Sequence, residues 1–397
     1  MAGSGPVSIG IIGASWRAQY YLRIARQLPE SFVVRHALVR TESSATQVAA
    51  DWGVPATTDA TTFLRNGPYD YVVVATPRAV TPQLILWLVA AGIPVLTETP
   101  PAEDLPGLVD LYGKIGEAPV QVAEQYQFQP QHAARLAAAR SGLLGTVTSA
   151  RMSIAHGYHG VSMLRFAIGA GFGPVAITAQ AMTERLFSAR GRDDWNAEFV
   201  ETDARRTTAL LRFGDGQEQR FGQLDFSDEQ YFSPIRSRHI GIQGSRGEVE
   251  DDRVSYLTVP GSAVHESLYR ETTGVDGDLE GSFLRRVWLG RNVYYENRFV
   301  PARLNDDELA VAEVMQRMAE FIRTGLEFYG LADASHDHYL GLLIDEAART
   351  GRVVRSAAVP WAMARSVASD RTNTSGMTGS GMTGNGMTGS GTAAERG

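Results

Sequence analysis

Short apolar runs alternate with amphipathic segments along the first 125 residues of the chain. Apolar runs of about four to eight residues are typical of buried parallel strands, and a period of about 3.6 residues is typical of helices between them. The pattern predicts strands at 8–12, 32–39, 71–75, 95–97 and 120–122, and helices near 18–27, 44–52, 82–91 and 105–115. Gly53, Gly92 and Gly116 fit left-handed positions after three of these helices. We therefore expect an α/β domain with a parallel sheet.

From about residue 145, longer segments with alternating apolar positions replace this pattern. They predict strands at 146–154, 175–181, 205–213, 218–226, 239–244 and 247–258, with a hairpin turn at 213–216. Helices are expected at 306–324 and 334–350, capped by Asn305 and Asp333. The second half is therefore expected to be an α+β domain with a large, mainly antiparallel sheet. The pattern leaves 183–205 and 272–295 unplaced.

These changes of pattern divide the chain into an α/β domain at 1–124, an α+β domain at 125–364 and a tail at 365–397. The tail is rich in Gly, Ser and Thr and repeats the sequence Gly-Met-Thr-Gly. Such a segment buries too little apolar surface to offset the entropy cost of ordering it, so we expect disorder. A methionine-rich docking tail is the alternative.

Composition narrows the classes of function. The content of 44% hydrophobic and 20% charged residues describes a globular protein, and a net charge of −7 without a basic run argues against a nucleic-acid partner. The absence of cysteine excludes disulfides, a thiolate nucleophile and a thiolate-held metal. The longest apolar run, 84–91, is too short to span a membrane, and residues 1–6 contain no signal-peptide pattern. We expect a cytoplasmic protein with no membrane partner.

The first predicted strand breaks into a glycine turn and leads directly into a helix. Such a turn aims unpaired backbone N–H groups at one point, where a phosphate can bind. The turn meets the dinucleotide fingerprint G-x-G-x-x-G/A at Gly13 and Ala18 but has Ser15 at the middle position. The predicted phosphate-binding residues are Gly13, Ala14, Ser15, Trp16 and Arg17. The alternative is a strand-turn-helix that binds no ligand.

The end of the second predicted strand bears on the choice of cofactor. An acidic residue about 20 residues after the glycine turn binds the ribose 2′-hydroxyl of NAD, whereas an arginine favours the 2′-phosphate of NADP. Arg40 occupies this place, and Thr41 and Ser43 add hydroxyl groups. The sequence therefore favours NADP, while Glu42 keeps NAD open.

Three other groups of polar residues give weaker indications of function. His336, Asp337 and His338 look like metal ligands, but close neighbours on a helix point in different directions, so we expect no metal site. The segment containing Arg236, Arg238 and His239 has two interpretations: it meets an anionic substrate at a pocket mouth, or it is a solvated loop. Paired aspartates at 193–194, 251–252 and 306–307 suit turns and helix starts.

Four stretches in order give the chain a wider resemblance. They are Val72-Val-Val-Ala-Thr-Pro77, the Ala91-Gly-Ile-Pro-Val-Leu-Thr-Glu98-Thr99-Pro100 segment, Val122-Ala-Glu-Gln-Tyr126-Gln-Phe128-Gln-Pro130, and His156-Gly-Tyr-His159 followed by Leu164-Arg165 and Gly169. Over nearly the whole chain to about Trp361, this order resembles the Gfo/Idh/MocA family, named after glucose-fructose oxidoreductase and inositol dehydrogenase.

The resemblance implies a nicotinamide enzyme whose sheet domain holds a sugar, cyclitol or related polyol above the cofactor. It places His159 at the position of the family's catalytic histidine, and an imidazole can act as acid or base near neutral pH. It implies contacts between the cofactor and the following residues: Thr76, Pro77, Glu98, Thr99, Pro100 and Gln125. It also implies a homo-dimer or homo-tetramer paired through sheet faces.

Three positions depart from the family pattern. Thr99 replaces the lysine that lies between substrate and nicotinamide, Ala155 replaces an aspartate, and Thr81 replaces a histidine that often follows the family's Ala-Thr-Pro turn. A hydroxyl cannot supply the positive field of the lysine, and Lys114, the chain's only lysine, lies elsewhere.

Nearby polar side chains offer a replacement for the missing groups. The candidates are Tyr126, His156 and Tyr158 beside His159, joined with Glu124 and Gln125 in a proton relay. Tyr126 with His159 is the predicted catalytic pair. The alternatives are that Tyr126 is an interdomain packing aromatic and that His159 is satisfied by a backbone carbonyl.

The expected function is therefore that of an NADP-dependent oxidoreductase acting on a carbonyl or alcohol, or an imine, of a sugar-like or secondary metabolite. Three alternatives stay open. They are a redox-assisted glycosidase that oxidises its sugar transiently, an imine reductase that needs no lysine, and a non-catalytic sensor of NADP(H).

Overall fold

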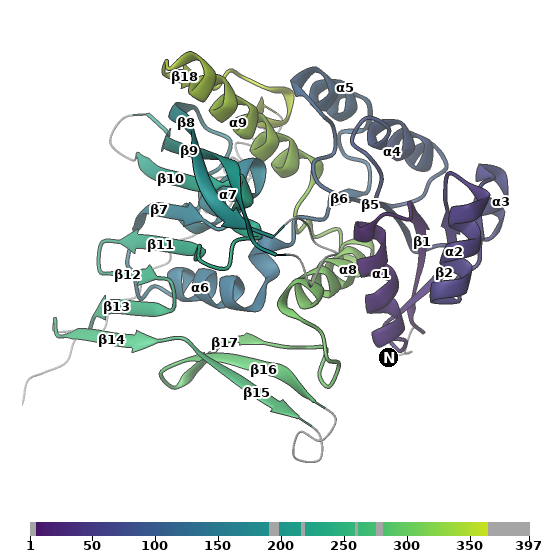
Figure 1. Ribbon diagram of the computed structural model, residues 1–397, viewed down its shortest axis with the longest axis horizontal. Helices are drawn as coiled ribbons and strands as arrows, with labels where there is room; N and C mark the ends of the chain where they lie inside the picture. The colour runs from purple at the N-terminus through teal and green to yellow at the C-terminus, as the bar shows by residue number, and fades with distance from the viewer. Residues whose placement is uncertain (1–4, 190–197, 216–218, 259–260, 275–280, 364–397) are drawn as a thin grey trace, which may run out of the picture.

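The computed structural model of the chain describes residues 5–189, 198–215, 219–258, 261–274 and 281–363. The predicted tail at 365–397 and part of the unplaced segment 183–205 lie outside the described residues. Figure 1 shows an α/β domain built from the N-terminal third, beside a second domain dominated by a large sheet.

The N-terminal domain is a six-stranded parallel sheet in the order β3-β2-β1-β4-β5-β6. Its strands are β1 (Val7–Ile12), β2 (Phe32–Leu38), β3 (Ala56–Thr57), β4 (Tyr71–Val74), β5 (Val95–Thr97) and β6 (Val120–Val122). Its helices are α1 (Trp16–Gln27), α2 (Glu42–Trp52), α3 (Ala60–Arg65), α4 (Thr81–Ala90) and α5 (Leu105–Ile115). This is the Rossmann order, in which ligands bind beyond the carboxyl ends of the strands where the order reverses, here at β1 and β4. The predicted α/β fold is confirmed.

The second domain contains a nine-stranded sheet in the order β14-β13-β12-β11-β7-β10-β9-β8-β18. Its strands are β7 (Val147–Ser153), β8 (Val175–Ser188), β9 (Val200–Phe213), β10 (Arg220–Ser227), β11 (His239–Gly244), β12 (Gly247–Glu250), β13 (Arg253–Leu257), β14 (Ala263–Ser267) and β18 (Val354–Arg355). All neighbouring strands are antiparallel except β7 and β10, which run parallel. The expected large, mainly antiparallel sheet is confirmed, and its one parallel pair matters for the site described below.

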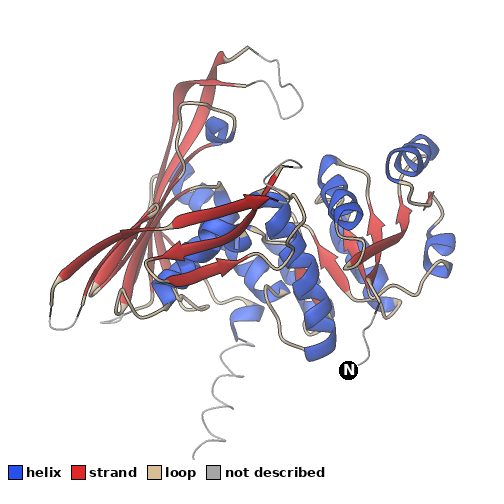
Figure 2. Ribbon diagram, turned by 90° about the horizontal axis from the view of Figure 1, so that it is seen from below, coloured by secondary structure: helices blue, strands red, loops and turns tan. Residues whose placement is uncertain are grey.

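Four helices and a small sheet complete the described part of this domain. They are α6 (Pro130–Arg140), α7 (Gly157–Ile168), α8 (Asp306–Thr324), α9 (Leu331–Thr350) and the antiparallel strands β15 (Tyr269–Gly274), β16 (Ser282–Leu289) and β17 (Asn292–Glu296). Two 3₁₀ turns, η1 (Tyr126–Phe128) and η2 (Asp228–Tyr231), follow β6 and β10. Helices lie between the large sheet and the Rossmann domain, as Figure 2 shows. The opposite face of the large sheet leaves Leu210 and Phe221 more than half exposed, and homo-oligomerisation through it stays a prediction.

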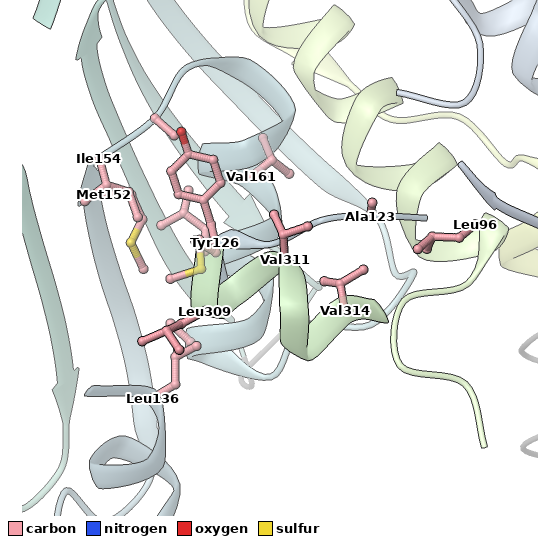
Figure 3. Packing of buried hydrophobic residues seen from close by; sticks show 14 of the residues in the cluster. Leu96, Ala123, Tyr126, Leu136, Met152, Ile154, Val161, Leu309, Val311 and Val314 are labelled. Atoms are coloured by element: carbon pink, nitrogen blue, oxygen red, sulfur yellow. The ribbon is translucent and has the colours of Figure 1, made fainter. Parts of the chain in front are cut away.

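One apolar core passes from the Rossmann domain into the second domain. Leu96 of β5 and Ala123, directly after β6, belong to the same cluster as Met152 of β7, Val161 of α7 and Val311 of α8. Figure 3 shows Tyr126 within this cluster. Continuous packing of this kind holds groups from both domains in a fixed relation.

Several local predictions differ from the structure. Gly53 and Gly92 have φ of 68° and 74° and end their helices as expected, but Gly116, with φ of 13°, is not left-handed. Asn305 caps α8, whereas α9 begins after Gly330, which places Asp333 inside its first turn rather than at its cap. The predicted strand 247–258 is two strands, because Asp251, at φ of 53°, makes the turn between β12 and β13.

The prediction missed elements that carry weak patterns. α6 is rich in alanine and arginine, and β3 and β18 are only two residues long. No helix among the described ranges combines the length and apolarity needed to cross a bilayer.

Candidate active site

A cavity of about 500 Å³ opens where the carboxyl ends of the Rossmann strands meet the second domain. The turns after β1, β4, β5 and β6 line one side, and segments after β7 and β10 line the other. The sequence-predicted residues that line it are Ser15, Trp16, Arg17, Thr76, Pro77, Glu98, Thr99, Gln125, Tyr126, His156, Tyr158 and His159. The structure therefore brings the predicted catalytic and phosphate-turn residues to one place.

Five predicted cofactor residues lie outside this lining. Gly13 and Ala14 form the turn immediately before it, and Pro100 is buried behind Thr99. Arg40 and Thr41 lie at the carboxyl end of β2, one strand away from β1 in the sheet. A dinucleotide is long enough to reach from one strand end to the next, so this separation suits its two halves.

The turn after β1 has the geometry of a phosphate cradle. Gly13 has φ of 117°, and a Cβ at this position would lie 2.3 Å from the carbonyl oxygen of Ala75. Only glycine therefore lets β1 and β4 end so close together. Ser15 directly precedes α1, and its side chain makes no cap hydrogen bond, so the start of the helix can bind an anion.

Arg17 is fixed at the floor of the cavity. Its Nε donates to Glu98 Oε1 at 2.7 Å and its Nη2 donates to Gln125 Oε1 at 3.0 Å, while the Tyr21 hydroxyl donates to the same Glu98 oxygen at 2.5 Å. Burial opposes the charge of Arg17, but the Glu98 carboxylate more than compensates and raises the pKa of the guanidinium above its ordinary value. Arg17 therefore stays charged and joins α1 to the turns after β5 and β6.

The departures from the family pattern have structural roles of their own. Thr81 is buried, and its hydroxyl donates to the carbonyl oxygen of Pro77 at 3.2 Å, so it holds the turn after β4. Thr99 accepts a hydrogen bond from the Tyr158 hydroxyl at 3.3 Å. Ala155 is fully buried and offers no carboxylate.

The Glu124 carboxylate, in the segment after β6, lies beside the predicted catalytic histidine. His159 Nδ1 lies 2.6 Å from Glu124 Oε2, and the other oxygen of Glu124 accepts from the backbone N–H of Tyr126 at 3.1 Å. A carboxylate accepts, so Nδ1 carries the proton and Nε2 is the nitrogen left for proton exchange. Within the described residues nothing hydrogen-bonds to that Nε2. A pairing of this kind orients a histidine that acts as acid or base.

Aromatic rings surround His159 closely. The Tyr126 ring centroid lies 4.7 Å from that of His159 and the Tyr158 ring 4.2 Å, and the His156 ring lies 5.5 Å away. Burial raises the pKa of Tyr158 to about 12 and raises the pKa of Tyr126 further above its usual range. Both tyrosines therefore keep their protons at neutral pH and can donate hydrogen bonds.

His156 differs from His159 although both start the same helix. Burial, reinforced by His159 and Arg78, lowers the pKa of His156 to about 4. Its imidazole is therefore neutral at pH 7, and its backbone N–H donates to the Tyr231 hydroxyl at 3.2 Å.

The cavity also contains residues that the sequence did not single out as site residues. They include Tyr20, Ala75, Arg78, Tyr231, Phe232 and Asp307. Arg238 lines the cavity, as the pocket-mouth interpretation predicted, whereas Arg236 and His239 line a separate cleft on the sheet. Arg78 directly follows the turn at Thr76 and Pro77, which is the signal that could have found it.

The residues considered as metal ligands are engaged within the protein. His336 Nδ1 accepts from Trp361, Asp337 accepts from Arg165 and Tyr329, and His338 donates to the carbonyl oxygen of Glu103. They lie buried in α9, and none of them lines the cavity.

Comparisons with known proteins agree with this architecture. Residues 7–126 match the model of an oxidoreductase family with an NAD-binding Rossmann fold, Gfo/Idh/MocA. No curated protein sequence matches the chain.

Solved structures of similar fold cover most of the chain. One is an oxidoreductase from Agrobacterium radiobacter in complex with NAD+, L-tartaric acid and magnesium, with 17% identity, 88% of this chain and 98% of that chain covered, and a TM-score of 0.63. A myo-inositol dehydrogenase from Corynebacterium glutamicum has 18% identity, 89% and 100% coverage, and a TM-score of 0.60. A levoglucosan dehydrogenase in complex with NADH and L-sorbose has 16% identity, 90% and 100% coverage, and a TM-score of 0.64.

At these identities the solved structures show a shared fold, which covers both domains. The family match covers the Rossmann domain with the phosphate turn. Over residues 7–126, the chain matches the Gfo/Idh/MocA family of oxidoreductases, whose members have an NAD-binding Rossmann fold.

Proposed function

We propose that the protein is an NADP-dependent oxidoreductase that transfers a hydride to or from a sugar-like or secondary-metabolite substrate, at a C–O bond or at C=N. One observation carries the proposal: a single cavity joins the uncapped start of α1 to the His159–Glu124 pair. Its volume of about 500 Å³ suits a small ligand beside a cofactor ring.

The residues present fit a dinucleotide. The Gly13 turn and the N-terminus of α1 would hold the pyrophosphate, and the turns at Thr76–Pro77 and Glu98–Thr99 would flank the nicotinamide. When bound, the nicotinamide would supply or accept the hydride.

The choice of NADP is supported by the end of β2. Arg40 is exposed there, and within the described ranges its guanidinium has no carboxylate partner. The Thr41 hydroxyl lies 3.0 Å from that of Ser43 and caps α2, so hydroxyls and a helix start adjoin the arginine. Glu42, which kept NAD open, accepts a hydrogen bond from Thr58. This arrangement suits a 2′-phosphate better than a bare hydroxyl.

The chain's own residues would handle the proton. Glu124 orients His159, whose Nε2 would give a proton to the substrate oxygen during reduction or take one during oxidation. Tyr126, packed against His159, is the second member of the predicted catalytic pair. The polyol or sugar class of substrate is supported by the names of the dehydrogenases that share the fold.

Nicotinamide fluorescence titrations with NADPH and NADH, followed by absorbance assays, test the proposal. The substrate panel is myo-inositol, L-sorbose, levoglucosan, a nitrophenyl glycoside and a cyclic imine. Tighter binding of NADPH and a net change in nicotinamide absorbance with one compound support it. Binding of NADH at least as tight as that of NADPH overturns the cofactor choice.

The same panel separates the alternatives. Release of nitrophenol without net change in nicotinamide identifies a redox-assisted glycosidase. Tight NADPH binding with no reaction of any compound contradicts the oxidoreductase and favours a sensor.

A further inference from the structure

The hydroxyl of Tyr231 differs from the other hydroxyls of the cavity in how its hydrogen bonds are used. Tyr231 ends the 3₁₀ turn after β10 and lines the cavity. Its oxygen accepts from the Tyr126 hydroxyl at 3.2 Å and from the backbone N–H of His156 at 3.2 Å. A tyrosine hydroxyl has one proton to donate and two lone pairs that accept. Both acceptor positions are therefore occupied, and the proton remains.

The protons of the neighbouring tyrosine hydroxyls, Tyr126 and Tyr158, are already used in hydrogen bonds within the protein. Tyr126 donates to Tyr231, and Tyr158 lies within hydrogen-bond distance of the carbonyl and hydroxyl oxygens of Thr99. For the proton of Tyr231, the described part of the chain offers no acceptor. A donor without a protein acceptor, in a residue that lines a ligand cavity, is available to a ligand.

At position 99 the chain also lacks the charged hydrogen-bond donor that the resemblance implies for the reaction. By the resemblance, Thr99 stands where the family has a lysine between substrate and nicotinamide, and Thr99 itself serves Tyr158 as an acceptor. Charge that develops on the substrate oxygen during hydride transfer needs a fixed donor.

We propose that Tyr231 donates a hydrogen bond to the reacting oxygen of the substrate and so takes the place of the missing lysine. The inference rests on the proposed function and deepens it. During reduction the substrate carbon gains the hydride, the C=O π pair moves to oxygen, and the His159 imidazolium gives that oxygen its proton. Tyr231 keeps its own proton and stabilises the negative charge, so protons and electrons balance.

The electrostatic surroundings suit this role. Burial raises the pKa of Tyr231, so its hydroxyl remains protonated at neutral pH. The hydrogen bonds that its oxygen accepts and the Arg238 guanidinium, 5.4 Å from the ring centroid, act in the opposite direction and polarise the O–H bond. Tyr126, predicted from the sequence as the catalytic partner of His159, is in this proposal a positioning residue instead, because it acts on the substrate through Tyr231.

The test compares tyrosine-to-phenylalanine variants in steady-state kinetics, with NADP+ and the panel compound that the wild type oxidises fastest. Tyr231→Phe should lower kcat about 100-fold, the cost of one lost donor to a developing oxyanion, with the Kd of NADPH unchanged. Tyr126→Phe should lower kcat about tenfold, because it removes only the hydrogen bond that supports Tyr231. The matched control is Tyr256→Phe, which removes a hydroxyl that donates to Glu266 on β14, outside the cavity, and should leave kcat unchanged.

Replacing Tyr231 by 3,5-difluorotyrosine separates a chemical from a structural role. The fluorinated ring keeps its shape and hydroxyl but loses its proton at lower pH. If Tyr231 is the donor, the alkaline limb of the kcat profile shifts to lower pH, which a packing role would not produce. An unshifted limb, or a kcat within twofold of wild type for Tyr231→Phe, overturns the proposal and leaves the oxidoreductase intact. If the wild type converts no compound, both proposals fall together.

Discussion

The proposed site has a cofactor end and a reaction end, and the two are built in different ways. The cofactor end consists of the Gly13 turn and the Arg40 segment, which lie within about 30 residues of each other and depend on local backbone geometry. The reaction end gathers Glu124, His159 and Tyr231 from segments after β6, β7 and β10. The first end is a property of two consecutive strand-turn-helix units, β1–α1 and β2–α2, whereas the second exists only when both domains are packed together.

The largest expected effect concerns the reaction end and its two histidines. His159→Asn should lower kcat by about 10²- to 10⁴-fold, because it removes the acid or base that Glu124 orients. His156→Asn, one helical turn away, should have a smaller effect, since the low pKa of His156 keeps it neutral at pH 7. Both variants should bind NADPH as the wild type does, measured by nicotinamide fluorescence. Equal losses of kcat in the two variants would contradict the assignment of His159.

The difference between the two ends explains what the sequence could predict. The Gly13 turn and five of the six strands of the Rossmann sheet follow from local patterns, and the structure confirms them, whereas the two-residue strand β3 does not follow from such a pattern. His159 came from the resemblance, and Glu124 was predicted only as a relay member rather than as its direct partner. No periodicity shows that a carboxylate after β6 will meet a helix after β7, because that contact depends on domain packing.

Tyr231 shows most clearly what the sequence pattern alone could not predict. Alternation of apolar residues gives the position of β10 but not its direction relative to β7. These two strands turn out to be parallel, so the segments after their carboxyl ends lie together, and Tyr231 meets His156. If β10 ran antiparallel to β7, the segment after β10, which contains Tyr231, would lie at the opposite end of β7 from His156.

The cofactor end should respond to a single local change. Arg40→Ala removes the charge proposed to bind the 2′-phosphate, and the loss of one charge-assisted contact should weaken NADPH binding about 10- to 100-fold. NADH binding should stay the same, because NADH lacks that phosphate. Arg65→Ala, an exposed arginine on α3, is the matched control. Parallel losses for NADPH and NADH would show that Arg40 does not read the phosphate, and the cofactor end would then need another determinant.

The smallest expected effect is on the free energy of unfolding at acidic pH, and it should come from His132, on the reaction side of the molecule. His132 of α6 is buried, and burial together with Arg135 and Arg238 lowers its pKa to about 3. The unfolded chain binds a proton at this histidine below about pH 6.5, whereas the folded chain stays neutral down to about 3. The unfolded state therefore binds more protons in this window, and the free energy of unfolding falls as the pH falls.

Urea unfolding of wild type and His132→Gln at about pH 7.5 and about pH 5 measures this contribution. The variant should lose less stability between the two values, by at most about 1.4 kcal/mol per pH unit. Asp337, whose pKa burial raises to about 6, acts with the opposite sign, because its folded carboxyl binds a proton before the unfolded one does. Both proteins retain Asp337, so the difference between them isolates His132. Identical slopes would mean that acid sensitivity does not arise from this histidine beneath the reaction end, and the contrast between the two ends would then be confined to chemistry.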